Sequence, residues 1–182
     1  MMELTIHSAE DAPDGSKAIL DGIAADLGFV PNMAGTAAGS PALLSAFDGL
    51  RRAVGSGRLD PVARETAGVA VGVAVDNRYG VAFHSTVLAS LGVDDTELER
   101  MRSNRPPSDA KLAAVYELAR SIVVDRGKVD DEAVSRATAA GVTTPEILEI
   151  VAECTFAGLV GTLDNLAGRV ELDEFLRPRA WS

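Results

Sequence analysis

The most informative part of the chain runs Asp76-Asn77-Arg78-Tyr79-Gly80-Val81-Ala82-Phe83-His84-Ser85. Asn77 is a good helix N-cap, because its side-chain oxygen accepts a hydrogen bond from a backbone amide of the first turn. Each residue advances about 100° around a helix, so Asn77, Gly80 and His84 fall within one narrow sector, beside apolar residues. The sequence therefore predicts a helix from about residue 77 to 91 that carries one histidine on its apolar face.

A second helix is predicted immediately upstream, at residues 60–75. It begins with Asp60-Pro61, a capping residue followed by proline at the first helical position, where proline loses no hydrogen bond. Glu65 and Gly72 share one face of this helix, and glycine allows two helix backbones to approach closely. We therefore expect Glu65 and His84 to meet across the two helices, as a carboxylate that orients an imidazole.

The rest of the chain carries similar helical signals. Apolar residues recur at helical spacing in five further segments, residues 16–27, 40–54, 112–123, 130–140 and 144–166. Strand alternation is nearly absent. The pattern predicts an all-α bundle formed by a single domain over residues 1–182, with residues 1–15 as an N-terminal extension.

Composition excludes several classes of function. The chain has 182 residues, 47% of them hydrophobic, which is enough for one well-formed core. Its net charge of −10 repels phosphate backbones and anionic lipid, so we expect neither nucleic acid nor a membrane surface as a partner. No apolar run reaches the roughly 18 residues of a membrane span and no signal segment is evident, so we expect a cytoplasmic protein. The single cysteine, Cys154, excludes an internal disulfide and a thiolate-clustered metal site.

Four short motifs occur in a characteristic order, at Leu27–Asn32, Ser40–Leu44, Leu59–Glu65 and Asn165–Gly168. In this order the chain resembles the carboxymuconolactone decarboxylase family and its alkylhydroperoxidase AhpD-like branch, over roughly residues 27–175. The resemblance implies an AhpD-like helical bundle and a homo-oligomer, either a trimer or a hexamer. It also implies that Glu65 and His84 correspond to the glutamate and histidine of the family's proton relay, since their spacing matches.

The chain departs from this family where its sulfur chemistry resides. The AhpD-like motif is Cys-x-x-Cys followed four residues later by histidine, and here Asn77 and Gly80 occupy the two thiol positions. Peroxide reduction needs one cysteine to attack oxygen and a second to resolve the sulfenic acid. Leu166 also stands where many relatives carry a histidine. The motif predicts a redox site from which the thiol chemistry has been lost.

Proton chemistry needs no thiol, and it is our first hypothesis. We predict cofactor-independent and metal-free acid/base chemistry, such as decarboxylation or isomerisation, on a small carbonyl or lactone compound. His84 is the predicted general acid or base, and Glu65 is its orienting partner. The predicted substrate contacts are Asn77, Tyr79 and Gly80, the last leaving room where a thiol would stand.

Other interpretations stay open at this level. The protein is alternatively a non-catalytic oligomeric binding protein, in which His84 is a hydrogen-bonded core residue, Asn77 a helix cap and Gly80 a helix-packing position. A third possibility is residual peroxidase activity through Cys154, although a lone cysteine on an apolar helix face is more often inert. A metal site built from His84, Glu65 and Asp76 lacks the ligand spacing of known sites.

Overall fold

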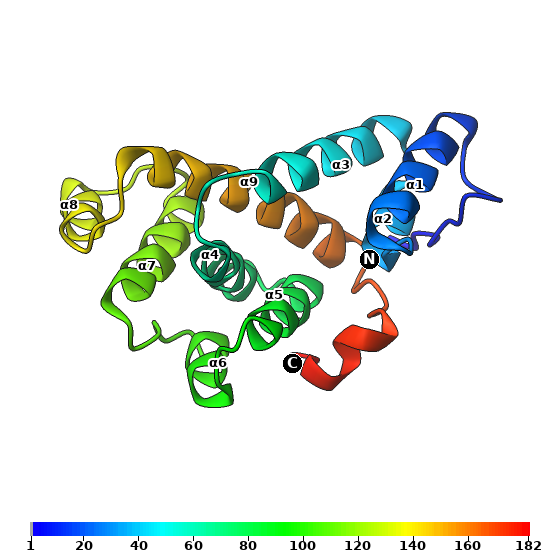
Figure 1. The fold of residues 1–182 in the computed structure, drawn as a ribbon. Helices are drawn as coiled ribbons and strands as arrows, with labels where there is room; N and C mark the ends of the chain where they lie inside the picture. Colours follow the sequence, from blue (N-terminus) through cyan, green and yellow to red (C-terminus); the bar gives the residue numbers. More distant parts are fainter. Residues whose placement is uncertain (1) are drawn as a thin grey trace.

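The computed structural model describes residues 2–182, which form an all-α bundle of nine α-helices and one C-terminal 3-10 helix (Figure 1). The elements are α1 (Asp14–Leu27), α2 (Asn32–Ala37), α3 (Pro41–Gly55), α4 (Pro61–Ala74), α5 (Arg78–Ser90), α6 (Asp95–Arg102), α7 (Ala110–Val124), α8 (Asp131–Ala139), α9 (Thr144–Leu166) and η1 (Glu174–Arg179). No strand is present in this part of the chain. The predicted all-α bundle is confirmed.

The long helix α9 extends along the molecule and connects its two ends (Figure 1). α7 and α8 lie at one end of α9, and α1 and α2 lie at the other. α4 packs against α5, α7 and α9, so it is enclosed on most sides. Its sequence suits that position, because alanine, valine and glycine allow neighbouring helices to approach closely.

Two hydrophobic clusters fill the bundle. One joins α4, α7 and the first half of α9, and the other joins α1, α2, α3, α5 and the second half of α9. Their buried members are mainly alanine, valine, leucine and isoleucine, as expected from an aromatic content of only 4%. Within residues 2–182, Phe47 is the only phenylalanine among these buried members.

The junction between α4 and α5 is fixed by hydrogen bonds. Asp76 adopts a left-handed backbone conformation with φ of 54°, which turns the chain between the two helices. The backbone amide of Asn77 donates to the Gly72 carbonyl over 2.8 Å, and its side-chain oxygen accepts from the Gly80 amide over 2.8 Å. Asn77 is thus the N-cap of α5. The turn directs two consecutive helices side by side, which is how Glu65 comes to face His84.

The segment before α1 packs on the bundle. The backbone amide of His7 donates to the Gly35 carbonyl over 3.0 Å, and the His7 side chain is 21% exposed. His7 is therefore partly buried against α2. None of the helices within residues 2–182 is long and apolar enough to cross a membrane.

Candidate active site

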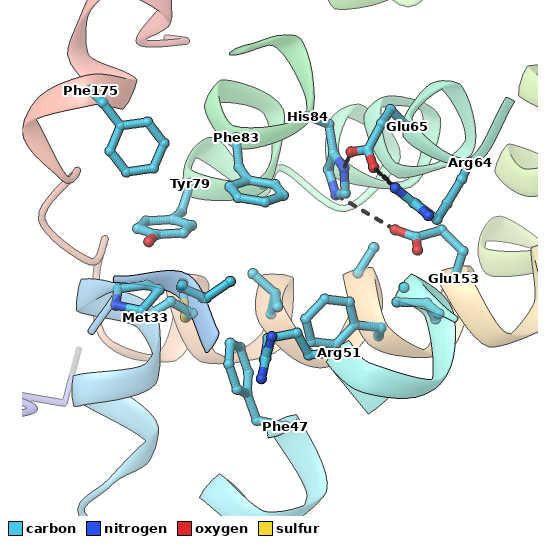
Figure 2. A pocket seen from close by; sticks show the side chains of 18 of the residues that line it. Met33, Phe47, Arg51, Arg64, Glu65, Tyr79, Phe83, His84, Glu153 and Phe175 are labelled. Carbon is cyan, nitrogen blue, oxygen red and sulfur yellow. Dashed lines mark hydrogen bonds and ion pairs between the residues drawn. The ribbon is translucent and has the colours of Figure 1, made fainter. Parts of the chain in front are cut away.

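A cavity of about 410 Å³ lies between α3, α4, α5 and α9 (Figure 2). The volume is within the usual range for small-molecule sites, about 300–1,000 Å³. Its walls hold all five phenylalanines of the chain, together with the ring of Tyr79. The phenylalanines are Phe29, Phe47, Phe83, Phe156 and Phe175. An aromatic chamber has thus been assembled in a protein that is otherwise almost free of aromatic residues.

Charged groups gather at one end of this chamber (Figure 2). Nδ1 of His84 lies 2.8 Å from Oε2 of Glu65, and both residues are buried. Nε of Arg64 donates to the other oxygen of Glu65 over 3.0 Å. A carboxylate only accepts, so the hydrogen on this side of the imidazole resides on Nδ1. The second ring nitrogen, Nε2, is left for the chamber.

Gly68 makes this arrangement possible. It lies on α4 one turn after Glu65, directly beneath the imidazole. A Cβ atom built on Gly68 would lie 2.5 Å or less from three ring atoms of His84. Carbon atoms in contact are normally about 3.5–4.0 Å apart, so any side chain here would displace the ring. The glycine is required by the close approach of the histidine to the α4 backbone.

Glu153 is the functional candidate that the sequence interpretation missed. It projects from α9 into the same end of the chamber, with Oε1 3.7 Å from Nε2 of His84 (Figure 2). Its side chain is only 2% exposed, and Oε1 has no hydrogen-bond partner. A signal for it does exist in the sequence, because this carboxylate shares the buried face of α9 with Ile150 and Ala157.

The three acid/base groups shift one another's pKa values. Burial lowers the pKa of His84, but the hydrogen bond and charge of Glu65, with the charge of Glu153, outweigh burial and raise it above 6.5. Burial raises the pKa of Glu65, but His84 and Arg64 outweigh it, and the net pKa is lowered. Burial, assisted by the charge of Glu65, raises the pKa of Glu153 against the opposing effect of His84. The site therefore stabilises the ionised form of Glu65, and His84 and Glu153 each hold a proton up to a higher pH than they would in water.

The three predicted substrate contacts occupy different positions. Asn77 is fully buried, caps α5 and is not among the residues that line the chamber. Tyr79 lines the chamber with its ring, while its hydroxyl donates to Asp173. Burial and this hydrogen bond raise the pKa of Tyr79 far above its ordinary value, so the hydroxyl stays protonated. Gly80 also lines the chamber, but a Cβ there would overlap the Asn77 amide, so the space left by its missing side chain serves the helix cap.

Cys154 faces away from this chemistry. It is buried in the cluster between α4, α7 and α9, and its thiol donates to the Ala119 carbonyl over 3.6 Å. Burial, with the nearby charge of Glu153, raises the pKa of the thiol to about 12. Within residues 2–182, no group of three or more histidine, cysteine, aspartate or glutamate side chains is placed to hold a metal ion.

No protein-family model and no curated protein sequence matches this chain. Solved structures do resemble it. An uncharacterised peroxidase-related protein from Ralstonia eutropha, described as an alkylhydroperoxidase AhpD core, superposes with a TM-score of 0.79 at 23% identity, over 94% of this chain and 93% of that one. A peroxidase-related protein from Silicibacter sp. gives a TM-score of 0.75 at 17% identity, over 95% and 91% of the two chains.

A third similar structure is a cysteine-to-alanine variant of the debrominase Bmp8 in complex with 2,3,4-tribromopyrrole. It superposes with a TM-score of 0.77 at 17% identity, over 98% of this chain and 95% of that one. At these identities the comparison establishes the architecture and leaves the activity to be argued from the site. The chain thus has the all-α AhpD-like fold that its motifs predicted.

Proposed function

We propose that this protein is a cofactor-independent enzyme that catalyses acid/base chemistry, such as decarboxylation or isomerisation, on a small carbonyl or lactone compound. One observation carries the proposal. The buried Glu65–His84 pair presents its second imidazole nitrogen, Nε2, to an aromatic chamber of about 410 Å³. A positioned proton carrier beside a small-molecule cavity is what this class of reaction requires.

The acid in this proposal is the imidazolium form of His84, which Glu65 stabilises through its hydrogen bond and its charge. In a decarboxylation, the bond to the carboxylate carbon breaks, CO₂ leaves, and the electron pair passes to the neighbouring carbonyl as an enolate. The Nε2 proton of His84 first hydrogen-bonds the developing oxyanion and then protonates the carbanion carbon, leaving a neutral imidazole that recovers a proton from water. Glu65 holds the ring in place and stabilises its charged form.

The positions expected for thiols support proton chemistry over peroxide reduction. Asn77 and Gly80 carry no sulfur, and the Cys154 thiol is buried outside the chamber with a raised pKa. A non-catalytic binding protein remains the second candidate, favoured by the loss of both thiols. A chamber filled by side chains would support it further, and the open volume argues instead for a bound small molecule.

The proposal is tested with a panel of small β-keto acids, enol lactones and ketones in D₂O. Consumption, CO₂ release and deuterium incorporation next to the carbonyl are followed by NMR. We expect His84→Gln to slow the best substrate by roughly 10²–10⁴-fold, the usual contribution of general acid/base catalysis, and Glu65→Gln to slow it as well. His7→Gln is the matched control, because His7 is the only other histidine of the chain. Undiminished turnover in both site variants contradicts the proposal.

We also propose that the protein assembles as a homotrimer or a hexamer. The exposed side of α9 carries Leu148, Val151 and Leu166, which are 65%, 42% and 52% exposed. Apolar side chains along one helix face favour burial between subunits. Light scattering coupled to gel filtration measures the assembly, and Leu148→Glu with Val151→Glu should shift it toward the monomer. A wild-type monomer contradicts this proposal.

A further inference from the structure

Glu153 is a buried polar group whose role the Glu65–His84 pair does not explain. Oε1 has no hydrogen-bond partner, although Glu153 is only 2% exposed. Leaving a buried polar atom without a partner costs on the order of 1–3 kcal/mol. A packing role alone would be served better by an apolar side chain, such as those of Ile150 and Ala157 on the same face of α9. The orphan oxygen instead indicates a partner that arrives with a ligand.

The position of the orphan oxygen defines what that partner is. Oε1 of Glu153 and Nε2 of His84 are 3.7 Å apart, too far for a hydrogen bond to each other, and both groups face the chamber. One ligand oxygen placed roughly 2.8 Å from each would complete two hydrogen bonds at once. The gap therefore suits a single ligand oxygen that hydrogen-bonds to both groups.

The other residues that line the chamber indicate which kind of ligand fits it. Flat aromatic walls favour a planar ring or conjugated system, which stacks on them or meets their edges. At the polar end Arg64 and His84 both lie against Glu65, and burial raises the pKa of Glu153, so its carboxyl group is protonated more readily than in water. Arg51 also lines the chamber, but it is paired with Asp48 and Asp26. This end accordingly favours an oxygen that carries negative charge.

We propose that the carboxyl group of Glu153 and Nε2 of His84 together bind one oxygen atom of a planar phenolate or enolate ligand, whose ring lies among the phenylalanines. The inference deepens the proposed function, because it names the class of substrate and a second acid beside His84. Glu153 donates the second hydrogen bond to the oxyanion that the reaction develops. It contacts the ligand directly, and Glu65 acts only through the imidazole.

The test uses 4-nitrophenol as the probe, because its ionised form absorbs visible light and reports the charge of the bound oxygen. Binding is measured by calorimetry and by absorbance near neutral pH. We expect the wild-type protein to bind the phenolate form preferentially, so that the bound probe is more ionised than the free probe. 4-Nitrotoluene, which has the same ring without the oxygen, should bind more weakly, by roughly tenfold or more for two lost hydrogen bonds.

Variants at Glu153 separate a hydrogen-bond donor from an ionised carboxylate. Glu153→Gln keeps a neutral donor of the same size, so phenolate binding should stay within about threefold of wild type. Glu153→Leu removes the donor and should weaken phenolate binding by roughly tenfold or more while leaving 4-nitrotoluene binding unchanged. Glu149→Gln makes the same substitution one turn earlier on α9, outside the chamber, and should change neither. Circular dichroism verifies that each variant is folded.

Several outcomes overturn the inference. Equal binding of the two probes by the wild-type protein, or a failure to bind 4-nitrophenol, contradicts the proposed oxygen site. An unchanged affinity of Glu153→Leu for 4-nitrophenol contradicts it as well. A gain of more than about tenfold in the affinity of Glu153→Gln for 4-nitrophenol indicates that the native carboxylate is ionised and repels the phenolate. The two proposals fail separately. If turnover depends on His84 but probe binding does not depend on Glu153, only the present inference is contradicted. If probe binding depends on Glu153 but the protein turns over no compound of the panel, only the proposed enzymatic function is contradicted.

Discussion

The packing of Gly68 against His84 yields the sharpest stability prediction. In Gly68→Ala, the new methyl group would meet three ring atoms of His84 at 2.5 Å or less, so the imidazole must retreat by roughly 1 Å or more. Overpacking of this kind costs about 1–3 kcal/mol. Movement of the ring also weakens its 2.8 Å hydrogen bond to Glu65, and a hydrogen bond to a charged group contributes about 1.5–3 kcal/mol.

Alanine is a better helix former than glycine by about 1 kcal/mol, which offsets part of this loss. We therefore expect Gly68→Ala to lower the free energy of unfolding by about 2–4 kcal/mol and Tm by roughly 5–15 °C. Gly49→Ala is the matched control, because a Cβ at this position of α3 meets nothing within 4 Å. It should stabilise the protein by about 0.4–1 kcal/mol.

Urea unfolding followed by circular dichroism measures both changes, and NMR of the two imidazoles reports the position of His84, with His7→Gln as the assignment variant. In a His84→Ala background the obstacle is absent, so Gly68→Ala should there be neutral or stabilising. A Gly68→Ala protein as stable as wild type, with an unshifted His84 resonance, refutes the reasoning. So does an equal loss of stability in the presence and absence of the imidazole.

Three further predictions concern charge, the cysteine and the helix cap. Because the pKa of His84 is raised in the folded protein, its stabilising effect is complete below pH 6.5 and is lost as pH rises through the folded-state pKa. Because the pKa of Glu65 is lowered, its stabilising effect is present above pH 4.5 and is lost as pH falls through the folded-state pKa. The stability difference between wild type and His84→Gln, measured by urea unfolding, should accordingly be largest between pH 4.5 and 6.5, and a difference independent of pH contradicts the coupling. The buried Cys154 thiol, with a pKa of about 12, should react with a disulfide reagent at least roughly 10³-fold more slowly in the folded protein than in urea, and rapid native-state labelling would restore the case for thiol chemistry. Asn77→Ala removes the N-cap of α5 and should lower the free energy of unfolding, measured in urea, by about 0.5–2 kcal/mol. Gly80→Ala should destabilise this variant less than it destabilises wild type, because the Asn77 amide no longer lies where the new Cβ must go. If the two losses of stability are additive, the Asn77 amide does not pack over Gly80.

Much of the fold follows from local signals. Ser40, Asp60 and Thr143 all cap helices through their side chains, and each precedes a proline near the first helical position. The predicted start of α9 at Thr144 agrees with the structure, where Thr143 is the N-cap and forms a reciprocal capping box with Glu146. Such signals are legible because a cap depends on residues within one turn of each other.

Part of the site follows from the same local geometry. Glu65 and His84 lie on consecutive helices joined by a short turn, so their helical faces already indicate that they meet. Glu153 depends on a different kind of information. Glu153 lies 69 residues after His84 in the sequence. Only the packing of α9 against α4 and α5 brings its Oε1 to 3.7 Å from Nε2 of His84.

The sequence by itself determined the helices, their order and the carboxylate–imidazole pair, because helical periodicity and capping act over a few residues. It also determined that no thiol stands at positions 77 and 80. Only the tertiary structure decided that all five phenylalanines surround one chamber, that the Asn77 amide fills the space above Gly80, and that Glu153 completes the polar end. These features depend on how distant helices pack, and the free energy of that packing is a property of the whole bundle rather than of any segment.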